Sequence, residues 1–317
     1  MCDLNTVTVR DEGCDEVTGD HPLLSRRAET RPQKRFSVLQ LGTRRAKQRG
    51  VTLGMTLFDY FDRTAIIHLP ERTDRFTALA FELSKVGLDI RSEKVLVPHA
   101  PKPTCANGFP SRGVYGNFLS HLGIIEQAYA DNLDRVLILE DDAIFSRSFK
   151  SKQQTILNNL RSREWDMVFL GHSIKSGLPV SDTGLVQFSG NFLWARCYGV
   201  NRNAMPRVIE YLQQTIKREP DHPDGGKMYI DGALSEFRRL NPDVVCLLSS
   251  PCLSVQRGSP SSLAGANWYD TKLVLREAAS LARQMRDELW RRGVITIGPP
   301  KSHSYWIKID RATPWPK

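Results

Sequence analysis

The sequence predicts an α/β fold, a single Rossmann-like domain whose central sheet is mostly parallel. Between residues 65 and 171, short apolar runs alternate with longer segments in which apolar residues recur at helical spacing. Such alternation is typical of consecutive βαβ units. The apolar runs are continuous, as expected for strands that are buried on both faces of a parallel sheet.

The first half of this region shows the pattern most clearly. Thr73 is a candidate N-cap for a helix whose apolar face ends at Gly87, since a glycine commonly ends a helix. A second helix carries Phe118 and Leu122 on one face and leads into the next strand. The expected elements are strand 65–69, helix 73–86, strand 95–97, helix 113–130, strand 136–139, helix 149–160, strands 165–171, 185–188 and 191–200, helices 203–217 and 231–239, strand 244–248 and helix 272–292.

The two ends of the chain differ from its middle. Residues 1–54 lack sustained periodicity, which predicts a flexible extension that is either dispensable or a tethering arm. Residues 55–268 form the expected folded domain, and residues 269–317 hold an amphipathic helix and a tail. This helix either packs on the domain or lies on a membrane surface or a partner. Its apolar stripe consists of Val274, Ala278, Leu281, Met285 and Leu289.

The net charge of +9 is concentrated at the ends. Residues 1–54 hold 10 basic and 7 acidic side chains, residues 272–317 hold 10 and 4, and the residues between are neutral overall. We therefore expect no nucleic-acid-binding face in the folded domain. Affinity for an anionic membrane is expected only from the ends.

Cysteine usage and the first residues indicate a cellular location. The six cysteines include no Cys-x-x-Cys pair and no zinc-type spacing, which predicts reduced thiols. Residues 1–20 lack the apolar stretch of a secretory signal, and no apolar run is long enough to span a bilayer. We expect a cytoplasmic protein, with the inner face of the membrane as a peripheral alternative.

One stretch of the sequence carries its clearest chemical signal. Four aliphatic residues run directly into Glu140, Asp141 and Asp142, and in open α/β sheets ligands bind at the carboxyl ends of strands. Three adjacent carboxylates repel one another, so they either stay hydrated in an acidic turn or bind a divalent cation, Mn²⁺ or Mg²⁺. On an extended strand end Glu140 and Asp142 point the same way and Asp141 points opposite. We assign Asp142 as the direct metal ligand, with Glu140 on the metal or on a ribose.

Five motifs follow one another along the chain in a recognisable order. They are Ile66–Arg75, Tyr115–Leu122, Leu137–Ala143, Asp166–Gly171 and Tyr198–Asn201. Together they make the chain resemble glycosyltransferase family 25, which includes bacterial lipooligosaccharide galactosyltransferases and animal collagen galactosyltransferases. The resemblance covers about residues 62–263 and implies a GT-A-like fold. It departs from the family pattern at His68, where Asn is usual, and after Asp231, where Gly232 follows.

The resemblance implies a binding site for a nucleotide-sugar donor. The implied donor-binding residues are His68, Leu69, Arg72, Arg75, Ser120, His121, Glu140 and Asp141. Guanidinium groups suit phosphate, although Arg72 and Arg75 also fit a solvated helix start. Ser120 and His121 have an alternative role as packed residues of a helix, because a helical histidine is commonly structural.

A second set of residues is assigned to the acceptor. The family inverts the anomeric carbon, so one carboxylate should act as general base, and Asp231 is the candidate because it follows the glycine-rich loop 224–227. An N-cap is the competing interpretation of Asp231. Gln256, Arg257 and Ser259 resemble a loop that closes over the acceptor, and a plain surface loop is the alternative.

These residues lead to one main hypothesis and one alternative. The main hypothesis is an inverting, metal-assisted transfer of a hexose, expected to be galactose from UDP-galactose, to a glycan or lipid-linked glycan in lipopolysaccharide or other surface polysaccharide synthesis. Charge accumulates on the leaving diphosphate, and a cation stabilises it. The alternative is a catalytically silent relative that binds a nucleotide sugar or a glycan. Phosphoryl transfer ranks last, since neither a P-loop nor a kinase motif set is present.

Overall fold

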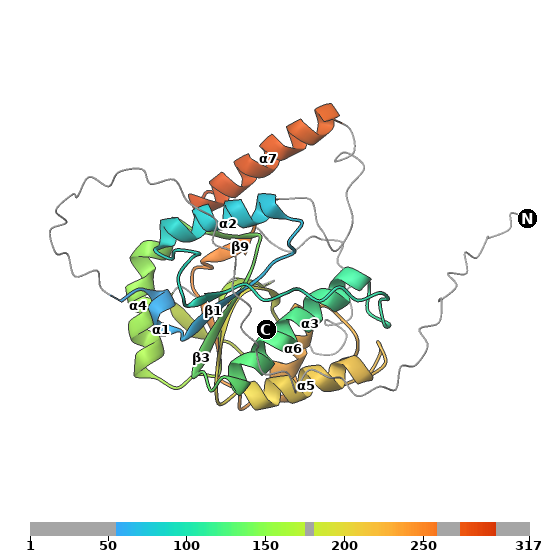
Figure 1. Ribbon diagram of the computed structural model, residues 1–317. Helices are drawn as coiled ribbons and strands as arrows, with labels where there is room; N and C mark the ends of the chain where they lie inside the picture. Colours follow the sequence, from blue (N-terminus) through green and yellow to red (C-terminus); the bar gives the residue numbers. More distant parts are fainter. Residues whose placement is uncertain (1–54, 175–180, 259–272, 296–317) are drawn as a thin grey trace, which may run out of the picture. The chain divides into compact units, whose positions relative to one another are not determined.

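The computed structural model of the protein describes residues 55–174, 181–258 and 273–295 (Figure 1). Within these ranges the chain forms an α/β fold around a seven-stranded sheet. The predicted α/β class with a mostly parallel central sheet is confirmed. The extension expected at residues 1–54 lies outside the described residues.

The sheet has the strand order β2-β1-β3-β7-β5-β8-β6. Strand β7 is antiparallel to both of its neighbours and β6 is antiparallel to β8, whereas the remaining pairs are parallel. The end of β3 therefore lies between a parallel and an antiparallel neighbour. The strands are β1 (Arg63–Ile67), β2 (Val95–Leu96), β3 (Arg135–Glu140), β5 (Met167–Ser173), β6 (Leu185–Gln187), β7 (Leu193–Asn201) and β8 (Cys246–Ser249).

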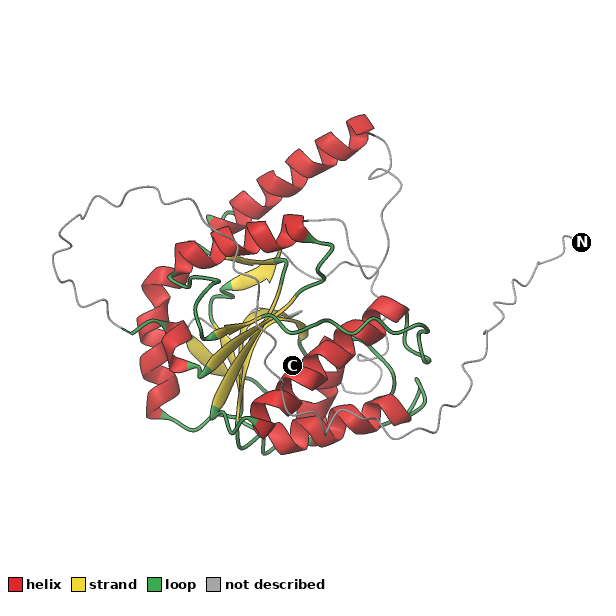
Figure 2. Ribbon diagram, in the orientation of Figure 1, coloured by secondary structure: helices red, strands yellow, loops and turns green. Residues whose placement is uncertain are grey.

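Helices cover both faces of the sheet (Figure 2). One apolar cluster packs one face against α3 (Arg112–Ala130), α5 (Met205–Lys217) and α6 (Ile230–Leu240). A second cluster packs the other face against α1 (Leu57–Tyr60), α2 (Thr73–Val86) and α4 (Phe149–Ser162). The sheet is thus the middle layer of three.

Strand β3 shows how the sequence fixes this arrangement. Val136 and Ile138 belong to the cluster beneath α3, Leu137 and Leu139 belong to the cluster beneath α2, and all four side chains are fully buried. Each such burial contributes about 1.5–3 kcal/mol of transfer free energy. Because side chains alternate between faces, the next residue, Glu140, is directed to the α3 side.

Three short elements were not expected from the sequence. They are α1 and a separate two-stranded antiparallel sheet of β4 (Ala143–Phe145) and β9 (Ser254–Gln256). Elements of three or four residues are too short to show a hydrophobic period. The β4–β9 pair matters for the site, because it brings Gln256 beside the acidic turn.

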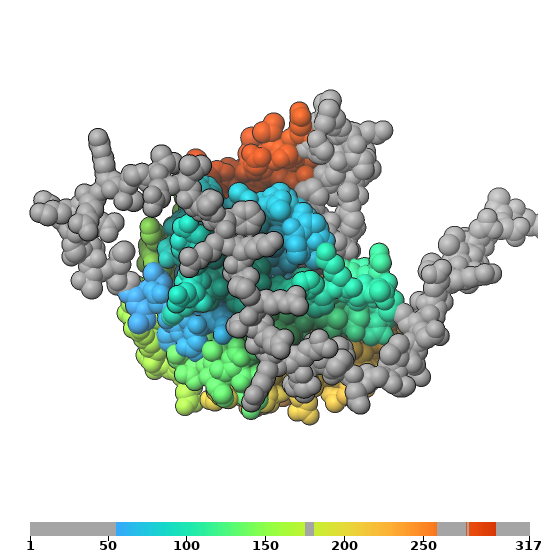
Figure 3. Space-filling view, in the orientation of Figure 1, coloured from blue at the N-terminus to red at the C-terminus, as the bar shows by residue number. Residues whose placement is uncertain are grey.

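The C-terminal helix α7 (Leu273–Arg291) packs on the domain through its last turns. Trp290 is 8% exposed and forms a small cluster with Ile144 and Val255, and Arg291 pairs with Glu82 of α2 at 2.7 Å. Figures 1 and 3 show α7 in orange-red at the top of the view. In the predicted stripe, Leu281 and Met285 are 65% and 67% exposed, and the side chains of Val274 and Ala278 lie outside the described residues. Packing thus uses residues beside the stripe, and the stripe itself faces solvent at these two positions.

Two general expectations can be compared with the structure. Among the residues described, no helix is long and apolar enough to cross a membrane. Cys197, Cys246 and Cys252 are free thiols. Cys105, in contrast, is disulfide-bonded, so the expectation of reduced thiols is wrong for this residue; the spacing of cysteines in sequence does not reveal which of them approach in space.

Candidate active site

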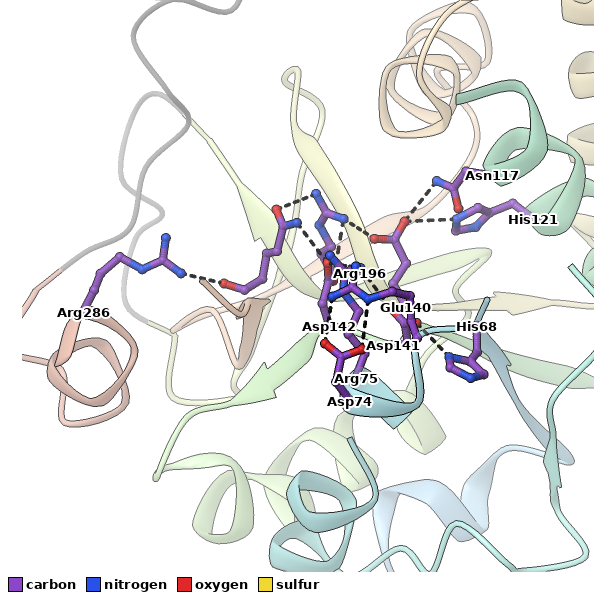
Figure 4. A network of polar contacts seen from close by, with 12 residues as sticks. His68, Asp74, Arg75, Asn117, His121, Glu140, Asp141, Asp142, Arg196 and Arg286 are labelled. Atoms are coloured by element: carbon purple, nitrogen blue, oxygen red, sulfur yellow. Dashed lines mark hydrogen bonds and ion pairs between the residues drawn. The ribbon is translucent and has the colours of Figure 1, made fainter. Parts of the chain in front are cut away.

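The acidic residues lie together at the end of β3, as Figure 4 shows. Glu140 is the last residue of the strand, and Asp141 and Asp142 form the turn before β4. All three are buried, with 9%, 6% and 3% of their surface exposed. Buried carboxylates require partners, so the contacts of each acid define the site.

Glu140 is held by residues of β7 and α3. Pairing of Leu139 with Cys197 brings the next residues, Glu140 and Arg196, together across the two antiparallel strands, where they form an ion pair. Asn117 donates to Oε1 of Glu140 at 3.2 Å, and Nε2 of His121 lies 3.4 Å from the same oxygen. Burial alone raises the pKa of Glu140, but the charge of Arg196 and the contact with His121 lower it to about 2.

Asp141 points the other way, toward the end of β1 and the start of α2. Its Oδ2 lies 2.9 Å from Nδ1 of His68, and its Oδ1 accepts a hydrogen bond from Nη1 of Arg75 at 3.1 Å. The Asp141 amide also donates to the carbonyl oxygen of Ile67 at 3.1 Å. The expectation that Glu140 and Asp141 face opposite sides is therefore met, and two predicted donor-binding residues meet at Asp141.

One carboxylate oxygen of Asp142 accepts a hydrogen bond, and the other accepts none from the described residues. Its Oδ2 accepts a hydrogen bond from Nε2 of Gln256 at 3.0 Å and lies 3.2 Å from Nη1 of Arg75. Its Oδ1 accepts no hydrogen bond from the described residues; Nη1 of Arg196 is 3.9 Å away. Burial raises the pKa of the Asp142 carboxyl; Arg196 opposes the shift, and the charge of Glu140 adds to it. An added positive charge would therefore stabilise the ionised form of Asp142.

Arg196 joins these groups, and the sequence reasoning did not identify it. Its Nη1 pairs with Glu140 and its Nη2 donates to Oε1 of Gln256 at 2.9 Å. Gln256 in turn donates to Asp142, so Arg196 and Gln256 link Glu140 to Asp142 in a polar chain of four side chains. One signal was present in the sequence: Arg196 is the one charged residue between Asn191 and Val200, inside an otherwise apolar strand.

Several predicted donor-binding residues make contacts of a structural kind. Arg72 pairs with Asp74 in the first turn of α2, at 2.9 and 3.0 Å, as a helix-start residue would. Ser120 donates to the carbonyl oxygen of Gly116 at 2.9 Å, within its own helix. Leu69 is half-buried, and its carbonyl oxygen accepts the amide hydrogen of Arg72 at 2.8 Å.

His121 lies behind Glu140 and has no exposed surface. Its Nδ1 is 2.9 Å from the hydroxyl of Tyr198, and its other nitrogen faces Glu140. A direct contact between His121 and a donor is therefore not supported by this geometry. His121 instead contacts Glu140 and helps to orient that carboxylate.

Asp231 lies in the first turn of α6, which begins at Ile230 with Tyr229 as its N-cap. The N-cap interpretation of Asp231 is therefore wrong, because the helix starts one residue earlier than the sequence suggested. Its two carboxylate oxygens accept hydrogen bonds from the amides of Trp194 and Gly232, at 3.0 and 2.9 Å. Because Trp194 lies two residues before Arg196 on β7, this contact brings Asp231 to the same part of the strand as Arg196.

Helix α7 holds the strand that carries Gln256. Nη2 of Arg286 donates to the carbonyl oxygen of Gln256 at 3.1 Å, and the Asp287 carboxylate accepts the amide hydrogen of Gly258 at 3.0 and 3.3 Å. The Arg257 amide donates to the carbonyl oxygen of Asp142 at 2.7 Å. The predicted loop at Gln256 and Arg257 thus lies at the acidic turn, whereas Ser259 lies outside the described residues.

The site can be tested for its fit to a divalent cation. Among the described residues no three His, Cys, Asp or Glu side chains are grouped so as to hold a metal ion. Asp142, however, offers a buried oxygen without a hydrogen bond. Mg²⁺-type sites commonly use one or two carboxylates and take their other ligands from water and substrate phosphates. Asp142 and Glu140 fit a cation of that kind, completed by the donor.

The model of glycosyltransferase family 25, described as LPS biosynthesis protein, matches residues 104–223. The predicted resemblance to family 25 is thereby confirmed. The family 25 segment contains the acidic turn and Arg196, whereas His68, Arg75 and Gln256 lie outside it. The site is therefore completed by residues on both sides of the matched segment.

The relatives include a protein named as an inactive member of glycosyltransferase family 25 and a protein named as a galactosyltransferase. "Inactive glycosyltransferase 25 family member 3" of Homo sapiens is 31% identical over 185 residues, which is 50% of this chain and 30% of that protein. "Procollagen galactosyltransferase 1-B" of Xenopus laevis is 29% identical over 131 residues, 35% of this chain and 21% of that protein. The chain thus spans less than a third of the length of either relative.

Similarity to solved structures is low in sequence and in superposition. The crystal structure of a glycosyltransferase involved in the glycosylation of the major capsid of PBCV-1 is 13% identical, with a TM-score of 0.30, over 70% of this chain and 99% of that one. Mannose-1-phosphate geranyltransferase from Thermus thermophilus is 12% identical, with a TM-score of 0.36, over 59% and 73% of the two chains.

Proposed function

We propose that this protein transfers a hexose, galactose from UDP-galactose, to a glycan acceptor with inversion of the anomeric carbon. The observation that carries the proposal is the buried carboxylate of Asp142 at the end of β3, with one oxygen open and two guanidinium groups beside it. A donor diphosphate carries the negative charge that such guanidinium groups bind. The family 25 match of the surrounding segment supports a sugar donor.

The reaction needs four contributions from the site. A cation held by Asp142 and Glu140, Mn²⁺ or Mg²⁺, would supply stabilisation of charge on the leaving diphosphate. Arg75, held between Asp141 and Asp142, adds a fixed positive charge on the β1 side. Asp231 is assigned as the general base that removes the acceptor hydroxyl proton. His121 and Gln256 orient the two carboxylates.

The acceptor is proposed to be a glycan or lipid-linked glycan of lipopolysaccharide or another surface polysaccharide, at the cytoplasmic face of a membrane. Helix α7 supports this location, because Leu281 and Met285 are exposed within a segment, 272–317, that carries more basic than acidic residues. Such a helix binds anionic lipid through apolar burial and charge. Salt-sensitive sedimentation with anionic vesicles, lost when Leu281 and Met285 are both changed to Asp, tests the proposal; retained sedimentation contradicts it.

Activity is tested with Mn²⁺ and a panel of nucleotide sugars. We expect release of UDP and transfer from UDP-galactose by the wild-type protein, and loss of turnover by a factor of about 10² or more in the Asp142→Ala variant. Asp243→Ala is the matched control, since Asp243 is an exposed acid paired with Arg207 at the surface. Undiminished turnover in Asp142→Ala would reject the assigned role of Asp142.

A catalytically silent, donor-binding relative is the second candidate. Two observations favour it: Glu140 is already paired with Arg196, and the human relative carries the word inactive in its name. Calorimetry with UDP-sugars separates the two candidates. Binding of UDP-galactose that saturates without UDP release or transfer, across the acceptors tested, supports the silent relative.

A further inference from the structure

The guanidinium group of Arg196 lies between the carboxylates of Glu140 and Asp142 and the side-chain amide of Gln256. Its Nη1 forms an ion pair with Oε2 of Glu140 and lies 3.9 Å from Oδ1 of Asp142, while its Nη2 donates to Gln256. Glu140 and Asp142 are the two residues that fit a divalent cation. The guanidinium group and a cation would therefore bind to the same carboxylates.

Two buried polar atoms of Arg196 and Asp142 make no hydrogen bond with the described residues. Oδ1 of Asp142, in a side chain that is 4% exposed, accepts no hydrogen bond from the described residues, and Nε of Arg196 donates none to them. At 3.9 Å the guanidinium neutralises Asp142 by charge without a hydrogen bond. A cation that ligates Oδ1 directly would satisfy this oxygen better.

Arg196 and a divalent cation are attracted to the same two carboxylates. Nη1 of Arg196 pairs with Glu140 and lies 3.9 Å from Oδ1 of Asp142, so a cation held by both residues would take the place of this nitrogen. Two positive charges at one pair of oxygens repel each other, and charges are weakly screened in buried sites. We therefore expect a bound cation to displace the guanidinium group.

We propose that Arg196 is an internal competitor of the divalent cation: its guanidinium holds Glu140 and Asp142 in the cation-free protein, and cation binding moves it off both. The proposal rests on the proposed function, since it takes Asp142 as a cation ligand. The Arg196 side chain is 17% exposed, which leaves a path for movement.

The experiment measures Mn²⁺ affinity of the full chain without nucleotide, by the electron paramagnetic resonance signal of free Mn²⁺. We expect Arg196→Gln to bind Mn²⁺ about tenfold more tightly than the wild-type protein, a factor equivalent to about 1.4 kcal/mol. The control is Arg207→Gln, which removes one positive charge from an exposed pair with Asp243. Its Mn²⁺ affinity should equal that of the wild-type protein.

A second variant covers the case in which loss of the guanidinium unfolds the chain. Arg196→Lys keeps one positive charge, but an ammonium group cannot reach Glu140 and Gln256 together as a guanidinium group does. Its Mn²⁺ affinity should therefore lie between those of the wild-type protein and Arg196→Gln. In the wild-type protein, Mg²⁺ titration should shift the Nε–Hε resonance of Arg196, identified as the signal absent from Arg196→Lys. An unshifted resonance contradicts the proposal.

The outcomes separate this proposal from the proposed function. Equal or weaker Mn²⁺ binding by a folded Arg196→Gln protein overturns the competition and leaves the metal role of Asp142 intact. Absence of Mn²⁺ binding from the wild-type protein and from both Arg196 variants overturns both. Tighter binding by Arg196→Gln, with unchanged binding by Arg207→Gln, supports both.

Discussion

The Asp231 carboxylate on α6 accepts a hydrogen bond from the amide of Trp194 on β7 at 3.0 Å. Trp194 has a φ of +70°, a left-handed conformation that is strained for a bulky side chain and concentrates at functional sites. Two residues further along β7 lies Arg196. Asp231 therefore either anchors this strained strand or acts as the base, and the two roles predict different effects of mutation.

We expect Asp231→Asn to lower kcat by a factor of about 10²–10⁴, the usual contribution of a general base, with only a modest loss in Tm. Asparagine keeps one oxygen, which can accept the Trp194 amide hydrogen, but it loses the acceptor of the Gly232 amide and cannot take a proton. Steady-state kinetics and thermal melting measure the two effects. A kcat near that of the wild-type protein together with a lower Tm would show that Asp231 only anchors the strand.

Helix α7 is predicted to contribute to the site through Asp287, which is 6% exposed and accepts the Gly258 amide hydrogen. Asp287→Ala leaves that amide and Arg286 without this partner, which should cost about 1–3 kcal/mol of unfolding free energy. Because Gln256 lies two residues before Gly258, the donor KM should rise as well. Leu281→Ala, on the exposed face of the same helix, is the control. Equal effects of the two variants would contradict the role of Asp287.

The sequence predicts the layers of the fold because each layer follows from local periodicity. Val136 to Leu139 alternate between two cores, and a continuous apolar run is the expected signal for such a strand. The same alternation correctly separates Glu140 from Asp141. These properties depend on neighbours in sequence.

The remaining contacts of the site depend on neighbours in space. Arg196 meets Glu140 only because β7 inserts antiparallel beside β3, in the register that pairs Leu139 with Cys197, and no local pattern specifies that register. Gln256 reaches Asp142 through a β4–β9 pair of three residues per strand, which is too short to predict. The burial of His121 behind Glu140 likewise follows from the packing of α3.

A buried hydrogen bond connects Tyr198 to the site through His121, whose Nδ1 is 2.9 Å from the Tyr198 hydroxyl. Tyr198→Phe removes that partner and should lower the unfolding free energy by about 1–3 kcal/mol, because a buried polar nitrogen is left unsatisfied. Chemical denaturation measures the change. Tyr129→Phe is the control, since Tyr129 is 41% exposed. A destabilisation no larger than that of the control would contradict the importance of this bond.

His172 on β5 gives the protein a predicted pH dependence of stability. It is 6% exposed, its Nε2 lies 2.8 Å from the carbonyl oxygen of Ser249, and burial lowers its pKa from 6.5 to about 4. Between these values the unfolded chain binds a proton that the folded chain does not. The stabilisation is therefore fully present above pH 6.5 and is lost as the pH falls toward 4, by about 3 kcal/mol in all.

Denaturation curves recorded across this pH range test the assignment to His172. His172→Gln should flatten the pH dependence of the unfolding free energy, because glutamine does not titrate and its amide can still donate to Ser249. The slope is the measured quantity, since the substitution also changes stability at every pH by altering packing in β5. His99→Gln, at an exposed position, should keep the wild-type slope. If His172→Gln keeps that slope too, carboxylates and not His172 cause the loss of stability in acid.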